Sequence, residues 1–130
     1  VGLYRTKARN IKKLAQILVD KYQGKVPDEF DELLKLPGVG RKSANVILAV
    51  GFNKPGLGVD THVNRVVNRI GMVAAKDPAK TEMYLKLLIP EERWGEAHHI
   101  FIAHGRKICS ARNPKCQDCI INEKCAKIMD

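Results

Sequence analysis

Hydrophobic residues recur at helical spacing along most of the chain, which has 130 residues. The first such pattern predicts a helix over residues 5–22, with mostly basic residues on its other faces. Pro27 suits the first turn of a second helix, which Leu36-Pro37-Gly38 would end. The apolar positions are Ile11, Leu14, Ala15, Leu18 and Tyr22 in the first helix and Phe30, Leu33 and Leu34 in the second.

A nearly unbroken apolar stretch begins at Ala44 and predicts a largely buried helix over residues 41–51. Residues 52–59 have turn composition and are the best candidate boundary between two lobes. Further helices are predicted over residues 61–70, from Pro78 to just before Pro90, and from about 91 to 105, with Asp60 and Asp77 as N-caps. Strand signals are close to absent, so the predicted fold class is all-α.

The charge of the chain favours a polyanionic partner. Its 23 Lys and Arg against 14 Asp and Glu give a formal net charge of +9. Nucleic acid is the first expectation and an anionic membrane surface the second. A charge that serves only solubility is the simpler alternative. No apolar run approaches the roughly 18 residues of a membrane span, so we expect no membrane insertion.

The four cysteines are confined to one short segment, with the spacing C-x6-C-x2-C-x5-C. They are Cys109, Cys116, Cys119 and Cys125. Clustering of this kind favours a metal or cluster site over a disulfide framework, and it favours an intracellular, reducing compartment, the cytoplasm or nucleoid. Zinc and an iron–sulfur cubane both accept four cysteines, and spacing alone does not decide between them. With four cysteines available, His98, His99 and His104 are not taken as ligands.

The turn Leu36-Pro37-Gly38-Val39-Gly40 precedes a basic pair and a helix. It is neither a P-loop nor a dinucleotide fingerprint, because the required upstream glycine is missing and residue 43 is serine. Gly38 and Gly40 can bring bare backbone N–H groups to an anion at the start of the following helix, and Val39 can point inward. Such a turn suits backbone phosphate, which carries no sequence information. A plain helix–helix turn is the alternative.

Lys42 and Asp60 are the candidate reactive residues. Lys42 lies in the first turn of a predicted helix, where the helix dipole and Arg41 disfavour the ammonium form. A lysine that loses its proton easily is a nucleophile that forms Schiff bases, although the residues alone favour a phosphate-binding lysine. Asp60 suits a helix N-cap, where an ionised carboxylate can also stabilise a cationic transition state.

Three motifs, LPGVGRKSANV, VDTHVNRVVNR and HGRKICSARNPKCQDCIINEKC, together resemble endonuclease III of the helix-hairpin-helix DNA glycosylase superfamily. The resemblance covers essentially the whole chain and is to the C-terminal portion of the family. It implies two helical lobes with a DNA-binding cleft between them. Residues 1–54 would be a partial lobe with the helix-hairpin-helix motif at about 28–51, and residues 55–130 a lobe with the cysteine loop at 109–125.

The resemblance also implies an activity and its residues. The expected enzyme removes oxidised or ring-saturated pyrimidines from duplex DNA and cleaves abasic sites by β-elimination. Lys42 would be the Schiff-base nucleophile, Asp60 its carboxylate partner, and the four cysteines the ligands of a [4Fe–4S] cluster. The expected DNA contacts are Leu36, Gly38, Val39, Gly40, Arg41, Ser43, Arg112 and Lys115.

Other interpretations remain open at this point. The chain could be a non-catalytic DNA-binding fragment, a mismatch-specific glycosylase of the same superfamily, or a zinc-bound adaptor. Members of the family also carry a stretch before the position of Val1. We therefore expect the 130 residues alone to expose apolar faces and to be poorly stable, and the full-length protein to be a monomer that needs that stretch.

Overall fold

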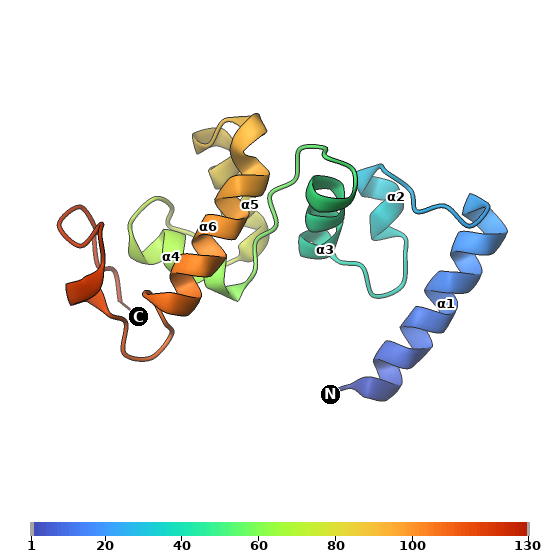
Figure 1. The fold of residues 1–130 in the computed structure, drawn as a ribbon, viewed down its shortest axis with the longest axis horizontal. Coiled ribbons are helices and arrows are strands. Elements are labelled where there is room, and N and C mark those ends of the chain that lie inside the picture. The colour runs from blue at the N-terminus through green and yellow to red at the C-terminus, as the bar shows by residue number, and fades with distance from the viewer. Residues whose placement is uncertain (1, 130) are drawn as a thin grey trace.

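The computed structural model describes residues 2–129, and helices form all the regular secondary structure of these residues (Figure 1). The elements are α1 (Tyr4–Tyr22), α2 (Phe30–Leu34), α3 (Arg41–Val46), the π-helical turn η1 (Ile47–Gly51), α4 (Thr61–Arg69), α5 (Pro78–Leu88), the 3₁₀ turn η2 (Glu91–Arg93), α6 (Trp94–Lys107) and the 3₁₀ turn η3 (Cys116–Asp118). The all-α class is confirmed. None of the described helices is both long and apolar enough to span a bilayer.

Helix α1 ends where the sequence predicts, at a left-handed turn. Gln23 and Gly24 have φ angles of 55° and 77°, and the Gly24 N–H donates to the Leu18 carbonyl at 2.8 Å. One side of the helix packs against its neighbours, but Ile11 on another side is 67% exposed and Val19 63%. This agrees with the expectation that an apolar face of the first helix is left uncovered.

Helix α2 begins at Phe30 rather than in a first turn at Pro27, so the predicted start is three residues too early. Glu29 is extended, with φ −115° and ψ 137°. Lys54 explains this, because its Nζ donates to the Asp28 carbonyl at 2.8 Å and to the Asp28 carboxylate at 2.7 Å. A cation from a distant loop holds the segment extended, which the local sequence does not reveal.

The first hydrophobic cluster surrounds the turn between α2 and α3. Its buried members are Leu33, Leu36, Ala44 and Leu48. Side chains from α1, among them Leu14, Ile17, Leu18 and Tyr22, pack on it and are partly buried. The cluster therefore anchors α1, α2 and α3 to one another.

The helix predicted over residues 41–51 is only partly buried, which corrects the expectation. Ala44, Asn45 and Leu48 are buried, but Val50 is 65% exposed. The buried side faces the connecting segment: a Cβ at Gly56 would overlap the Asn45 carbonyl oxygen, and the Leu57 N–H donates to Asn45 Oδ1 at 3.3 Å. Ala44, Ile47 and Leu48 face the first hydrophobic cluster, and Val50 faces solvent.

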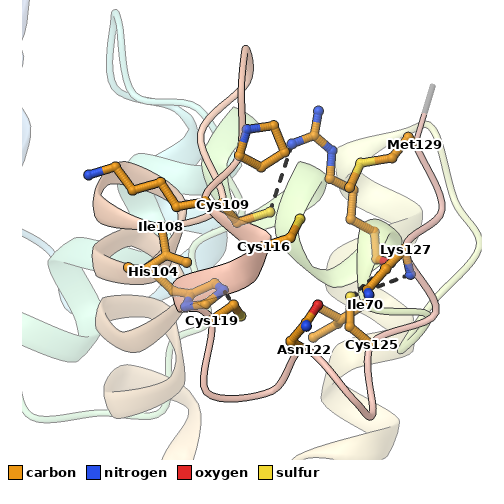
Figure 2. A pocket seen from close by; sticks show the side chains of 13 residues that line it. Ile70, His104, Ile108, Cys109, Cys116, Cys119, Asn122, Cys125, Lys127 and Met129 are labelled. Atoms are coloured by element: carbon orange, nitrogen blue, oxygen red, sulfur yellow. Dashed lines mark hydrogen bonds between the residues drawn. The ribbon is translucent and has the colours of Figure 1, made fainter.

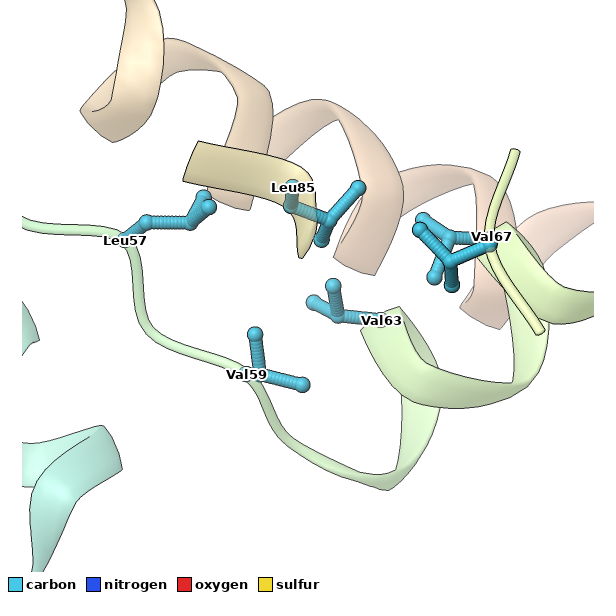
Figure 3. Close-up of a cluster of buried hydrophobic side chains, with 6 residues drawn as sticks. Leu57, Val59, Val63, Val67 and Leu85 are labelled. Atoms are coloured by element: carbon cyan, nitrogen blue, oxygen red, sulfur yellow. The ribbon is translucent and has the colours of Figure 1, made fainter. Parts of the chain in front are cut away.

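The second hydrophobic cluster lies between α4, α5 and α6 (Figure 3). Its buried members are Leu57, Val59, Val63, Val67, Val73 and Leu85, and Trp94, Ala97, Phe101 and Ile102 pack against it from α6 and its start. The caps of two of these helices are as predicted. Asp60 Oδ1 accepts from the N–H groups of His62 and Val63 at 2.8 and 2.9 Å, and Asp77 caps α5.

Candidate functional site

The turn between α2 and α3 exposes glycine backbone over a buried base. Leu36 is buried and Val39 packs on the first cluster, while Gly38 and Gly40 are exposed. Gly38 has a φ of 82°, and a Cβ there would lie 3.2 Å from Asn10 Nδ2 on α1. Because the side chain of Leu36 is buried, only the backbone of this residue can contact a ligand. The turn therefore offers backbone rather than side chains at its surface.

The N-terminus of α3 lies directly after this turn. Gly40 is its N-cap residue and supplies no side-chain cap. The backbone N–H groups of the first turn, at Arg41, Lys42 and Ser43, are therefore free of a capping side chain. Such N–H groups with the positive end of the helix dipole favour an anion.

The side chain of Arg41 forms an ion pair with Glu82 on α5. Its Nε and Nη2 donate to the two carboxylate oxygens of Glu82 at 3.2 and 2.8 Å, and its guanidinium lies 5.0 Å from the Phe30 ring centroid. Glu82 is buried and also accepts from Lys86 at 2.9 Å. Burial acts to raise the pKa of Glu82, but hydrogen bonds and charges from Arg41 and Lys86 outweigh it and lower the pKa. Arg41 thus ties α3 to α5.

Lys42 and Asp60 lie at the N-terminal ends of α3 and α4, one in the first turn and the other at the N-cap. Lys42 is exposed in the first turn of α3, and Asp60 is partly buried at the start of α4. Both cap bonds of Asp60 use Oδ1. Among the described residues, no donor lies within hydrogen-bond distance of Oδ2. One carboxylate oxygen is therefore available to a ligand while the other holds the helix.

His98, which sequence analysis set aside as a ligand, is only 5% exposed on α6, and its contact with the connecting segment was not foreseen. Its Nδ1 donates to the Gly58 carbonyl at 2.6 Å, and because a carbonyl only accepts, Nδ1 carries the proton. The pKa of His98 is lowered, chiefly by burial. The charges of His99 and Lys42 lower this pKa further, whereas the hydrogen bond to the Gly58 carbonyl and the charge of Asp60 act to raise it. His98 is therefore neutral more readily than an exposed histidine, and its Nδ1–H fastens α6 to the segment that leads to Asp60.

The four cysteines lie around one small cavity (Figure 2). Cys109, Cys116, Cys119 and Cys125 are all unpaired and partly buried, and all four line it. Within residues 2–129, no group of three or more His, Cys, Asp or Glu side chains is placed so that it could hold a metal ion. The four cysteines nevertheless line the same cavity, which is what the fold contributes to the site.

Arg69 also lines this cavity, from the last turn of α4. Its Nη1 donates to the Ser110 carbonyl at 2.7 Å and lies 3.8 Å from Cys109 Sγ, and its Nη2 donates to the Ala111 carbonyl at 3.1 Å. Its Nε is buried without a partner.

His104, set aside as a ligand, lines the cavity too, with Nε2 3.8 Å from Cys119 Sγ. Its place five residues before Cys109, in the last turn of a helix, is the signal that could have found it.

Arg65 joins α4 to the start of the cysteine loop. Its Nε and Nη2 donate to the Cys109 carbonyl at 3.2 and 3.0 Å, and Nη2 also donates to the Gly105 carbonyl at 2.9 Å. The same Nη2 lies 3.3 Å from His62 Nδ1, in the first turn of α4. The helix that Asp60 caps is therefore fastened to the cysteine segment.

The expected DNA contacts fall into two separate groups. Gly38, Gly40, Arg41 and Ser43 lie at the turn and the start of α3, whereas Arg112 and Lys115 are exposed on the cysteine loop. Figure 1 shows this loop at one end of the molecule, beyond α4 and α6, and the turn on the other side, between α2 and α3. The structure does not bring the two groups together.

Comparison with known proteins agrees with this fold. Residues 1–91 match the profile of the HhH-GPD superfamily base excision DNA repair protein. The chain is 52% identical over 124 residues to endonuclease III of Thermotoga maritima, covering 95% of this chain and 58% of that protein. A solved non-covalent endonuclease III–DNA complex matches with a TM-score of 0.93 and 48% identity, over 97% of this chain and 59% of that one. A trapped endonuclease III–DNA covalent intermediate, an estranged-adenine complex, matches with the same score and identity, over 98% and 60%.

The chain thus spans about three-fifths of the length of these relatives. The resemblance drawn from the three motifs is confirmed, as is the helix-hairpin-helix glycosylase fold.

Proposed function

Because the chain belongs to the HhH-GPD superfamily of base excision DNA repair proteins, we propose that the protein is a DNA glycosylase with abasic-site lyase activity. Its substrate is duplex DNA with an oxidised or ring-saturated pyrimidine, or with an abasic site. The observation that carries the proposal is Lys42, which is exposed in the first turn of α3 directly after the glycine turn, where its amine is open to a DNA strand that the turn holds. A covalent intermediate with DNA is known for endonuclease III, 48% identical to this chain, and a lysine amine suits such a bond.

Binding uses the exposed backbone of the turn. The N–H groups at the start of α3 hold a phosphate of the DNA backbone, which positions the strand without reading its sequence. The damaged nucleotide leaves the base stack and enters the site. The exposed Arg112 and Lys115 on the cysteine loop add sequence-independent attraction to phosphate.

The chemistry starts from a neutral Lys42. Its Nζ forms a bond to C1′ of the flipped nucleotide, the bond from C1′ to the base breaks, and the base takes the electron pair and a proton. Asp60, at the N-cap of α4, stabilises the positive charge that develops at the sugar and accepts a proton from the lysine. The C1′–O4′ bond then breaks, O4′ takes the electron pair and that proton, and an iminium forms between C1′ and the lysine nitrogen. Loss of a C2′ proton to solvent breaks the C3′–O bond by β-elimination, and the 3′-phosphate leaves with the electron pair.

We further propose that the four cysteines hold a [4Fe–4S] cluster. The donor set fits, because four thiolates line one cavity. Arg69 fits as well, since a buried cation with an unpartnered Nε favours an anionic group beside it. When bound, the cluster supplies a redox-active iron–sulfur centre held by four thiolates. Iron and sulfide analysis, with visible absorbance, tests this: a colourless protein that holds zinc alone would contradict it.

The two hydrophobic clusters support the division into lobes at residues 1–54 and 55–130. The first cluster uses residues up to Phe52 and the second begins at Leu57. We propose that DNA lies across the junction of these lobes, because Lys42 comes from one and Asp60 from the other.

Borohydride trapping tests the proposed reaction. The protein is incubated with duplex DNA that contains one abasic site, and sodium borohydride reduces the imine to a stable amine. We expect a covalent adduct with the natural sequence and none with Lys42→Gln. Lys25→Gln, at another exposed lysine, is the matched control and should trap as the natural protein does. An adduct that survives in Lys42→Gln would contradict the role of Lys42.

A further inference from the structure

We infer that Arg69 is the residue that sets the reduction potential of the metal–sulfur group in the cysteine cavity, an inference that rests on the proposed cluster. Arg69 is only 9% exposed. A buried charge is costly unless another charge or a set of hydrogen bonds compensates for it. The partners of Arg69 therefore indicate what it is there to stabilise.

Within residues 2–129, those partners do not include a carboxylate. No Asp or Glu oxygen of the described residues lies within ion-pair distance of the Arg69 guanidinium. The carbonyls of Ser110 and Ala111 accept two of its hydrogen bonds, and they are neutral. Nε is buried with no partner. The protein part of the site thus leaves a buried positive charge without a negative one.

The guanidinium faces the cysteines. Nη1 lies 3.8 Å from Cys109 Sγ, and the residue lines the same cavity as all four cysteines. Its backbone carbonyl accepts from the Ile128 N–H at 3.0 Å and from the Cys125 thiol at 3.7 Å. Arg69 therefore contacts the first cysteine of the loop through its charged guanidinium and the last through its backbone carbonyl.

This charge acts directly on one-electron reduction. The reduced form of an iron–sulfur group carries one more negative charge than the oxidised form, so a nearby cation stabilises it and raises the potential. Burial keeps water and salt from screening the effect. The guanidinium stays protonated at any accessible pH, so its contribution does not titrate away. Lys115 and Lys127 also line the cavity, but both are exposed and screened by solvent.

The test compares neutral and charged residues at this position. Arg69→Met and Arg69→Gln remove the charge, and Arg69→Lys keeps it. Lys124→Met removes one exposed charge in the same loop and is the matched control. Iron per chain and the reduction potential, followed by spectroelectrochemistry, are measured for each. We expect more negative potentials in both neutral variants, a potential near that of the natural protein in Arg69→Lys, and a much smaller shift in Lys124→Met.

A loaded neutral variant with the potential of the natural protein would overturn the inference. Loss of iron in both neutral variants but not in Arg69→Lys would support the same charge compensation, whereas loss in all three would reduce Arg69 to a packing role and overturn it. Failure of the cofactor proposal is distinct, because the natural protein itself would then contain no iron.

Discussion

Asp60 combines two roles in one carboxylate. Its Oδ1 caps α4 through two backbone N–H groups, and its Oδ2 has no protein donor among the described residues. The cap needs only an acceptor, which asparagine also supplies, whereas the proposed reaction needs a negative charge. Substitution can therefore separate the two roles.

We expect Asp60→Asn to fold with nearly natural stability but to trap abasic-site DNA on the order of 100-fold more slowly, because the charge is lost. Asp60→Ala should lose about 1 kcal/mol of unfolding free energy as well, because the cap is lost. Urea unfolding measures the stability and borohydride trapping the rate. A natural trapping rate in Asp60→Asn would exclude the carboxylate from the reaction.

His98 makes stability depend on pH. Its pKa in the folded protein is below the ordinary value of 6.5, chiefly because it is buried. The unfolded chain then binds a proton more readily than the folded one, so stability rises with pH in this range. The contribution of His98 is complete above about 6.5 and is lost as the pH falls toward the folded pKa.

We expect the unfolding free energy of the natural protein to fall more steeply than that of His98→Asn between pH 7.5 and pH 5. Urea unfolding across this range measures both, and the difference between them removes the effect of the other histidines. Parallel curves would mean that His98 is protonated as easily in the folded protein as in the unfolded chain.

At the scale of elements, the turn between α2 and α3 shows how two glycines separated by one residue differ. Gly38 has a left-handed φ of 82° and lies against Asn10, while Gly40 is extended with nothing within 4 Å of a Cβ. A side chain at position 38 would be strained by the backbone and crowded by α1. A side chain at position 40 would only cover the exposed backbone.

We expect Gly38→Ala to lower the unfolding free energy by roughly 1–2 kcal/mol, because an L-residue pays that cost in the left-handed region. Gly40→Ala should leave stability nearly unchanged but weaken binding to an abasic-site duplex, because its Cβ blocks the approach of phosphate. Urea unfolding measures the stability of both variants, and a DNA titration at fixed salt measures binding by Gly40→Ala. Equal binding by Gly40→Ala and the natural protein would argue against phosphate contact at this turn.

At the scale of the whole molecule, ion pairs and hydrogen bonds join segments that are distant in sequence. Arg41 and Glu82 join α3 to α5, and Arg65 joins α4 to the segment that follows α6. The first contact holds the helix that carries Lys42 against α5, and the second joins the helix that Asp60 caps to the cysteine loop. The chain has a formal net charge of +9, which suits the proposed DNA partner.

The sequence by itself determined the helices, the two aspartate caps and the grouping of the cysteines. Helical periodicity and capping depend on residues within one or two turns, so neighbours in sequence are enough to predict them. The same holds for the turn with Gly38 and Gly40. Lys42 and Asp60 were also found from local position, although their roles remain proposals.

Only the tertiary structure decided which groups meet across the chain. Arg41 reads as a DNA contact, yet its guanidinium bonds a glutamate 41 residues away. Arg69 and His98 show no local signal, because their importance comes from burial beside Cys109 and Gly58. Burial and long-range pairing depend on how helices pack against one another, and a hydrophobic pattern states which face is covered but not by which partner.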